Sequence, residues 1–201
     1  MFKYEKPNQR LTKVKAYDLI LSLTRGETLD NRQLSSLLVY FAPAAPKKPK
    51  TLFDWVKKAT AKKDVRNYLN YVYSDGERIY ASNGHIVLMV NTGQYDSGYY
   101  CPKTSIKDST VDYQYPDISR CVVPRNNMVD APIKRSYEYN TAMKQERVVI
   151  GEHVYDTAYV QMMDNYPGTN DTYLQQQTGK GTLVLKSYTG EVLGVVMALR
   201  K

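Results

Sequence analysis

Apolar residues in the first forty positions recur at helical spacing. Four of them stand at i, i+3, i+4 and i+7: Leu34, Leu37, Leu38 and Phe41. An earlier apolar group contains Leu19, Leu21 and Leu23, and Arg25-Gly26-Glu27 separates it from the second group. The pattern predicts two short helices between residues 12 and 41.

The stretch from Ala42 to Lys50 interrupts this pattern with prolines at positions 43, 46 and 49. Proline is excluded from helix interiors and favours an extended, exposed chain. We therefore expect a helical N-terminal appendage at residues 1–45, a proline- and lysine-rich linker at 46–50, and a single domain at 51–201.

A further helix is expected directly after the linker, with Thr51 as its N-cap. Its apolar face contains Leu52, Trp55, Val56 and Ala59. Lysines at positions 57, 58, 62 and 63 lie outside this apolar face and give the helix a positive charge.

Strands and tight turns follow the helix. Tyr68–Tyr73, Arg78–Ser82 and Ile86–Val90 have the composition of strands, and the turn signals Ser74–Glu77 and Asn83-Gly84 separate them. Residues 91–147 are punctuated by glycine and proline and predict little regular structure.

The same order returns near the C-terminus. Val148–Ile150 predicts a strand, and Val154–Tyr166 predicts a helix that Pro167-Gly168 ends. Gly181–Tyr188 and Val192–Leu199 predict two strands around Thr189-Gly190. A helix followed by a meander thus occurs at 51–90 and again at 154–199, which predicts an α+β fold.

Charge and composition narrow the class of protein. The 201 residues carry a formal net charge of +8 with a pI near 9.3, which favours an anionic partner such as nucleic acid. Two cysteines, Cys101 and Cys121, give no disulfide framework and favour a reducing cytoplasm. The apolar run at Ala16–Leu21 is short and contains an acid, so we expect no signal peptide and no membrane span.

Tyrosine is the main aromatic residue, at 19 positions against 3 for phenylalanine. Its amphipathic ring suits half-buried strand faces, interfaces and base stacking. Sheet packing is the favoured interpretation, and single-strand binding through stacked tyrosines is a third functional possibility.

Four short segments resemble, in the same order, motifs of the bacterial DNA polymerase sliding clamps. Asp64-Val65-Arg66 with Tyr68-Leu69-Asn70 resembles D-V-R-Y-Y-L-N, and Asn83-Gly84-His85 stands where the family has T-D-G-H-R-L. Tyr115–Pro124 resembles F-P-D-Y-x-R-V-L-P, and Val195–Arg200 resembles V-V-M-P-M-R-L. Together they cover roughly half of residues 51–201.

The chain also departs from that family. Its members have three similar domains per chain and pair into a ring of six, whereas this chain has room for about one. Ile86 replaces the arginine after Gly-His, and Ala198 replaces a proline. The resemblance implies a shortened clamp that forms a homo-oligomer and suggests a bacteriophage origin.

In such a ring, cations on the helices meet the phosphates of double-stranded DNA without reading bases. The resemblance gives this role to five residues: Lys57, Lys58, Lys62, Lys63 and Arg66. A solvated basic face near the linker is the alternative. Three acidic residues lie on or beside the helix predicted at Val154–Tyr166 and oppose DNA threading: Glu152, Asp156 and Asp164.

Sliding clamps also bind short peptides of DNA polymerases and other replication proteins in an apolar pocket. The resemblance assigns eight positions to this pocket: Leu69, Ser82, Gly84, His85, Val87, Pro124, Val195 and Met197. Ordinary core positions in strands are the alternative for each. The implied function is a processivity factor that holds DNA and tethers a polymerase.

Another function stays open: a clamp mimic that binds host replication machinery, or a transcription coactivator that uses the same pocket. Gln33–Leu38 loosely resembles a Q-L-x-x-L-F clamp-binding peptide, although an ordinary amphipathic helix explains it better. His85 has no second metal ligand at suitable spacing, and we find no candidate catalytic residues. We therefore expect no enzyme activity, metal or cofactor.

Overall fold

The computed structural model describes residues 13–30, 32–34, 36–37, 49–121, 127–132, 134–141, 144–168, 172–176, 181–187 and 189–199. Contacts divide the chain into two compact units, Met1–Lys47 and Lys48–Lys201. The assignment of residues 46–50 as a linker stays a prediction. None of the helices in the described ranges has the length and apolar character that a membrane span requires.

The first unit contains the helix α1, Lys13–Thr24, followed by helical residues at 32–34 and 36–37. Gly26 adopts a φ of +79° directly after α1, so the predicted break at Arg25-Gly26-Glu27 is confirmed. Asp30 and Gln33 form a reciprocal capping box: the Gln33 N–H donates to Asp30 Oδ1 at 2.7 Å, and the Asp30 N–H donates to Gln33 Oε1 at 2.9 Å. Leu37 is buried within this unit, which agrees with an amphipathic helix.

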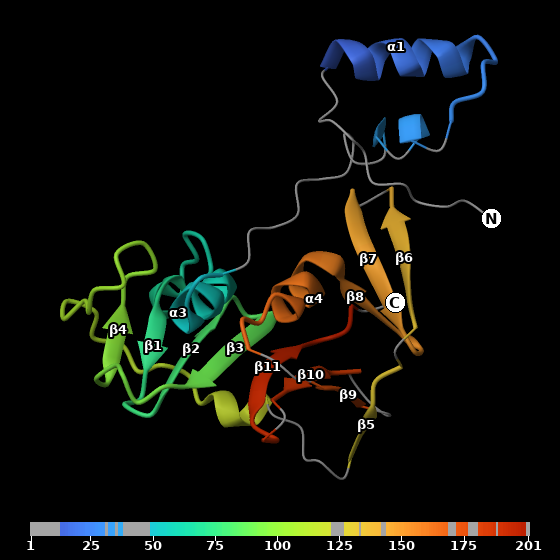
Figure 1. Cartoon of the computed structure of the whole chain (residues 1–201). Helices are drawn as coiled ribbons and strands as arrows, with labels where there is room; N and C mark the ends of the chain where they lie inside the picture. The colour runs from blue at the N-terminus through green and yellow to red at the C-terminus, as the bar shows by residue number, and fades with distance from the viewer. Residues whose placement is uncertain are drawn as a thin grey trace. The chain divides into compact units, whose positions relative to one another are not determined.

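The second unit is built on an antiparallel sheet of eight strands (Figure 1). These strands are β1 (Val72–Ser74), β2 (Arg78–Ser82), β3 (Ile86–Asn91), β4 (Gly98–Tyr100), β5 (Met128–Asp130), β9 (Thr172–Gln176), β10 (Leu183–Lys186) and β11 (Val192–Val196). Their order across the sheet is β4-β1-β2-β3-β11-β10-β9-β5. A smaller antiparallel sheet contains β6 (Arg135–Asn140), β7 (Gln145–Ile150) and β8 (His153–Asp156).

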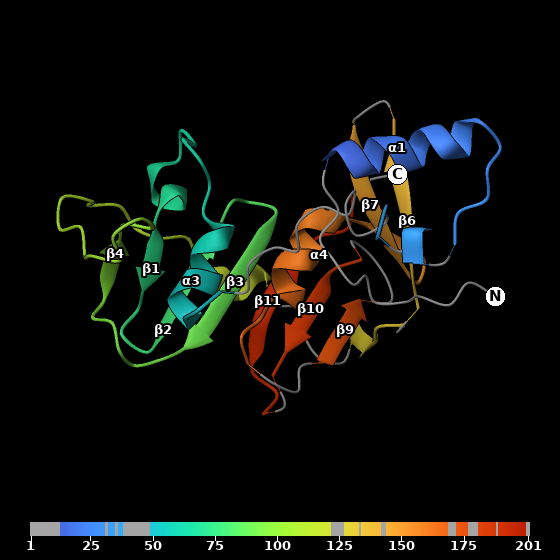
Figure 2. The same ribbon diagram turned by 45° about the horizontal axis from the view of Figure 1, so that its top comes forward.

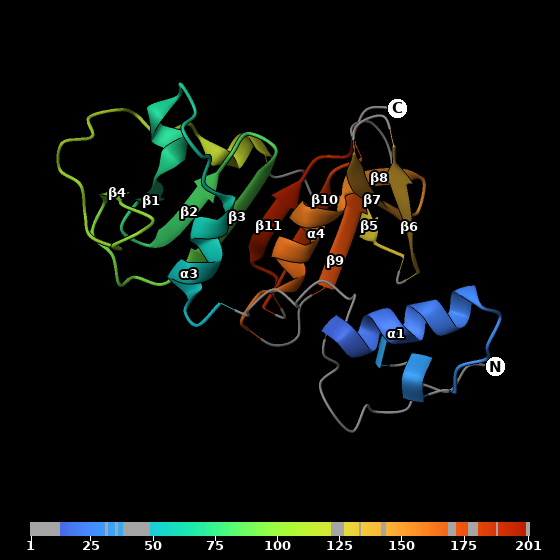
Figure 3. The ribbon, with the colours of Figure 1, turned by 90° about the horizontal axis from the view of Figure 1, so that it is seen from above.

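Two helices cover one face of the large sheet, as Figure 2 and Figure 3 show from different sides. The first is α3 (Leu52–Val56), continued by the 3₁₀ turn η1 (Lys57–Ala59), and the second is α4 (Thr157–Asp164). Thr51 caps α3 by accepting the Asp54 N–H at 3.0 Å, which confirms the predicted N-cap. Two further 3₁₀ turns are η2 (Asn67–Asn70) and η3 (Ile118–Cys121).

Each face of the large sheet has its own apolar cluster. On the helix side Trp55 is fully buried, and its indole N–H donates to the Met162 carbonyl at 2.7 Å, which ties α3 to the end of α4. Gly194 on β11 also faces this side, where an added Cβ would lie 3.1 Å from Leu88 and 3.3 Å from Met163. On the other face tyrosines 73, 80, 99 and 115 form a chain of ring contacts.

The mixed helix and sheet class is confirmed, and strand β2 has the predicted bounds. The predicted strand at Tyr68–Tyr73 is wrong in its first half, because residues 67–70 form the turn η2. The predicted helix at Val154–Tyr166 is wrong at its start, because His153–Asp156 pairs with β7 as strand β8. Residues 91–147 also contain more structure than predicted, namely β4, β5, β6 and the start of β7.

The Trp55 link gives a stability prediction. Trp55→Phe removes a buried N–H donor and leaves space beside Met162, so we expect the free energy of unfolding to fall by about 1–3 kcal/mol. Urea denaturation followed by circular dichroism measures this loss. Tyr137→Phe is the control, because Tyr137 is 65% exposed and its change should stay within about 0.5 kcal/mol. Equal losses in the two variants would contradict the structural role of the indole.

Candidate functional site

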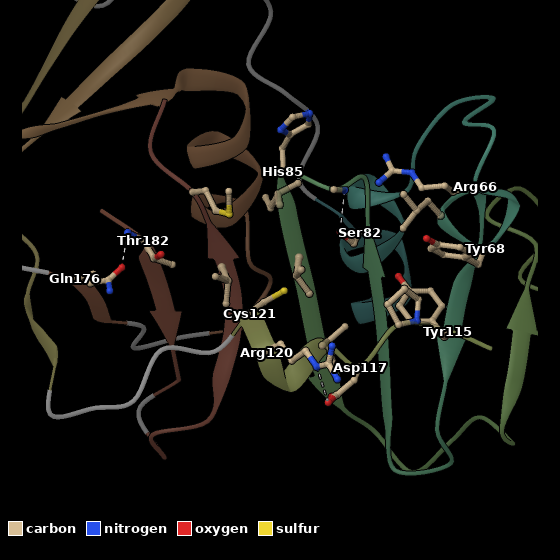
Figure 4. Close-up of a pocket in the computed structure, with 18 residues that line it drawn as sticks. Arg66, Tyr68, Ser82, His85, Tyr115, Asp117, Arg120, Cys121, Gln176 and Thr182 are labelled. Carbon is tan, nitrogen blue, oxygen red and sulfur yellow. Dashed lines mark hydrogen bonds and ion pairs between the residues drawn. The ribbon is translucent and has the colours of Figure 1, made fainter. Parts of the chain in front are cut away.

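A cavity of about 680 Å³ lies at the junction of β3 and β11, on the sheet face opposite the helices. We call it the junction pocket. Figure 4 shows that its walls come from segments far apart in the sequence. Its lining consists of Arg66, Tyr68, Leu69, Ser82, Gly84–Val87, Tyr115–Ile118, Arg120, Cys121, Gln176, Thr182, Val195 and Met197.

The floor of the junction pocket is apolar. Val87 and Val195 are direct cross-strand partners, so their side chains lie side by side on one face of the sheet. Leu69 and Ile118 are buried beside them, whereas Met197 is 48% exposed at the margin. A polarisable, exposed methionine beside a buried aliphatic floor suits an apolar ligand side chain.

The turn at Asn83-Gly84-His85 forms one wall and is held by local hydrogen bonds. Asn83 Oδ1 accepts the N–H groups of His85 at 3.0 Å and Ile86 at 3.2 Å, and Ser82 Oγ accepts the Gly84 N–H at 3.0 Å. The His85 ring stacks on Tyr159 of α4 at a centroid distance of 6.1 Å. The turn is therefore fixed against both the strand and the helix.

Arg66 supplies a fixed positive charge beside this turn. Its Nε and Nη2 donate to the two carboxylate oxygens of Asp64, each at 2.9 Å. This bidentate pair lowers the pKa of the Asp64 carboxyl from 3.8 to about 2. The pair is thus complete above pH 3.8 and is lost only as the pH falls towards 2.

Arg120 and Asp117 lie at the opposite end of the pocket (Figure 4). Nε of Arg120 is 3.8 Å from Oδ2 of Asp117, and both side chains are largely exposed. Burial raises the pKa of the Tyr115 hydroxyl, so this group is neutral near pH 7, and Cys121 is an exposed free thiol. The junction pocket therefore combines an apolar floor, neutral polar walls and an arginine near each end.

The structure brings together seven of the eight positions expected to bind a peptide. Leu69, Ser82, Gly84, His85, Val87, Val195 and Met197 all line the junction pocket. Pro124 lies outside the described residues. The lining residues Tyr115, Ile118 and Cys121 were not predicted, although they belong to the motif Tyr115–Pro124 that resembles the clamp sequences.

The five residues expected to bind DNA have different surroundings, and their role in DNA binding stays a prediction. Lys57 forms an ion pair with Asp54, with 2.6 Å between Nζ and Oδ1. Partial burial lowers the pKa of the Lys58 ammonium group. Lys62 and Lys63 were expected on the helix that follows the linker. This expectation is wrong, because α3 and its continuation η1 end at Ala59. Arg66 lines the junction pocket.

The described residues contain no group of three or more His, Cys, Asp or Glu side chains that could hold a metal ion. The two cysteines are free thiols. The junction pocket offers a ligand apolar contact, charge and hydrogen bonding.

No protein-family model matches the chain, and no curated protein sequence matches it. Among solved structures, the DNA polymerase III beta chain of Streptococcus pneumoniae matches with a TM-score of 0.46 and 10% identity over 75% of this chain. The DNA polymerase sliding clamp of Bacillus subtilis matches with a TM-score of 0.44 and 9% identity over 80% of this chain and 67% of its own length. The match covers 62% of the pneumococcal chain, less than two thirds of its length. These TM-scores are too low to support a functional inference.

Gly84 gives a test of the pocket wall. Its φ is +90°, and an added Cβ would lie 3.3 Å from Nη2 of Arg66. Gly76 has a similar φ of +101° with nothing within 4 Å, so Gly76→Ala should cost about 1–2 kcal/mol of stability through backbone strain alone. Gly84→Ala should cost roughly 1 kcal/mol more, because the pinned guanidinium must move.

Thermal denaturation of both variants measures the difference. Adding Arg66→Ala to Gly84→Ala should restore the additional stability of about 1 kcal/mol, because the guanidinium is gone, but not the part lost to backbone strain. Equal losses of stability for Gly84→Ala and Gly76→Ala would show that an alanine at position 84 does not meet Arg66.

Proposed function

We propose that this chain is a sliding-clamp-like accessory factor of DNA replication that captures a partner protein by a short peptide in the junction pocket. The single observation that carries the proposal is the gathering of seven peptide-pocket positions, chosen from sequence alone, around one cavity. These residues come from three separate segments: 69, 82–87 and 195–197. Core residues selected at random from strands would not line the same opening.

The shape and chemistry of the cavity support a peptide ligand. Its volume of about 680 Å³ falls within the range of roughly 300–1,000 Å³ that is usual for ligand sites. Val87 and Val195 on the floor and Met197 at the margin can accept aliphatic or aromatic anchors of a peptide. Arg66 and Arg120 can pair with its carbonyl or carboxylate oxygens.

The finer form of the proposal is a ring that encircles duplex DNA. It is supported by the net charge of +8 and by a helix followed by a three-stranded meander in two places: α3 with β1–β3, and α4 with β9–β11. In such a ring α3 and α4 would face the duplex. Several copies would have to pair through the edges of their sheets.

Two observations favour a second candidate, a clamp-mimicking interaction protein that uses the pocket without encircling DNA. The sequence of α4 contains no Lys or Arg, and Lys57 on the other helix is neutralised by Asp54. In addition, the outer edge of β4 is already hydrogen-bonded, because Tyr99 O accepts the Asp108 N–H at 2.8 Å and the Cys101 N–H donates to Ile106 O at 2.9 Å. A covered edge is poorly suited to pairing with another copy.

Peptide capture is tested with a fluorescent peptide of the Q-L-x-x-L-F type and the full chain. We expect Met197→Ala to weaken binding roughly tenfold, because it removes an exposed anchor contact of about 1–2 kcal/mol. Ile106→Ala is the matched control, since Ile106 is an exposed aliphatic residue outside the pocket lining. Absence of binding by the unmodified chain, or equal loss in both variants, would overturn the proposal.

Sedimentation with and without circular duplex DNA separates the two candidates. A ring predicts an oligomer that is retained on circular DNA and released when the DNA is linearised. Peptide binding by a chain that is not retained on circular DNA would support the clamp mimic.

A further inference from the structure

A second cavity, of about 870 Å³, lies in the same unit as the junction pocket and shares no lining residue with it. We call it the lysine cavity. Three loops surround it, and its lining consists of Thr60–Lys63, Asn67, Asn70, Tyr71, Cys101–Lys103, Thr110, Val111 and Tyr113. The cavity contains Lys62 and Lys63, the two lysines that do not belong to the helix.

The loop that carries these lysines is held in place at both ends. The Ala61 N–H donates to Leu69 O at 2.8 Å. Asp64 and Asn70 form a reciprocal pair: the Asp64 N–H donates to Asn70 Oδ1, and Asn70 Nδ2 donates to Asp64 O, each at 2.9 Å. Lys63 has a φ of +59°, an uncommon conformation for a residue with a side chain. The loop thus has a defined shape that presents two cations.

Another part of the lining is a closed turn after β4. The Cys101 N–H donates to Ile106 O at 2.9 Å, and the Ser105 N–H donates to Cys101 O at 2.8 Å. This turn carries Lys103, which lines the same cavity as Lys62 and Lys63.

The charge of the lysine cavity is uncompensated within the described part of the chain. Lys62, Lys63 and Lys103 are exposed and form no ion pair there, and no Asp or Glu belongs to the described lining. Three acids stand next to lining residues along the chain. Asp64 pairs with Arg66, Asp108 accepts the N–H and hydroxyl of the lining residue Thr110, and Asp112 is exposed between Val111 and Tyr113. Three cations converging on one cavity favour an anion with several charges.

An aromatic ring stands at the rim of the lysine cavity. Tyr113 is 54% exposed, its hydroxyl accepts Nδ2 of Asn67 at 3.4 Å, and its carbonyl accepts the Tyr99 hydroxyl at 2.7 Å. These contacts hold an exposed ring beside the lysines. Cations next to an exposed aromatic ring are the combination that binds single-stranded nucleic acid, because phosphates pair with the cations and bases stack on the ring.

We propose that the lysine cavity binds a single nucleic-acid strand, with phosphates held by Lys62, Lys63 and Lys103 and a base stacked on Tyr113. A loop-bounded cavity admits one backbone with its base, whereas a base-paired duplex has its bases turned inward and cannot offer one to Tyr113. This site does not rest on the peptide-binding function, since the two cavities are lined by different residues.

Fluorescence anisotropy with a labelled oligothymidylate and the full chain tests the proposal. Removing three phosphate contacts by the combined variant K62Q/K63Q/K103Q should weaken binding by at least about tenfold and reduce the slope of log affinity against log salt by about 2. Tyr113→Ala should weaken binding roughly tenfold with the salt slope unchanged. Lys134→Gln, an exposed lysine outside this cavity, should leave binding unchanged.

Two further measurements make the result decisive. The charge-preserving variant K62R/K63R/K103R should retain strand binding. The glutamine variant should keep the circular dichroism spectrum and melting temperature of the unmodified chain, which shows that its fold is intact. An RNA strand and a duplex of equal length serve as competitors. Tighter binding of the duplex than of either strand, no binding of the oligothymidylate, or equal losses for Lys134→Gln and the triple variant would overturn the proposal.

Discussion

The pairing of β3 with β11 is the constraint on which the second unit depends. It joins residues 86–88 to residues 194–196 in one antiparallel register. Because side chains alternate along a strand, this register turns Val87 and Val195 to the junction pocket and Ile86, Leu88 and Val196 to the helix side. A slip by one residue would exchange the two faces and bury the pocket floor under the helices. Gly194 allows the pairing, since a larger residue would meet Leu88 and Met163.

Local signals in the sequence were sufficient for the elements around tight turns. Strand β2 was predicted with its bounds because Gly76 and Gly84 mark turns on both sides of it, and both adopt a positive φ. Elements that depend on distant partners were not predictable in this way. His153–Asp156 has apolar residues whose spacing also fits a helix, and only pairing with β7 makes it a strand. Strand β6 is mostly exposed, so no burial pattern distinguishes it from a loop.

The pocket was more predictable than the DNA-binding surface for a physical reason. The pocket positions follow short motifs around strand ends and turns, whose geometry is set by nearby residues such as Asn83 and Ser82. The expected cationic helix had to continue from Leu52 to Lys63, and nothing in the lysine pattern shows that the helix stops at Ala59. The role of Arg66 likewise depends on Asp64, two residues away, which turns the guanidinium towards Gly84.

The segment between η1 and β1 serves both cavities with different residues. Arg66, Tyr68 and Leu69 line the junction pocket, whereas Lys62, Lys63, Asn67 and Asn70 line the lysine cavity. Asp64 connects the two sides, since its carboxylate holds Arg66 and its backbone holds Asn70. One cavity is apolar with isolated charges and the other is cationic, so a protein segment and a nucleic-acid strand would not compete for the same groups. Under the two proposals, the loop held by Asp64 and Asn70 would keep a protein partner close to a strand while separating the groups that bind each of them.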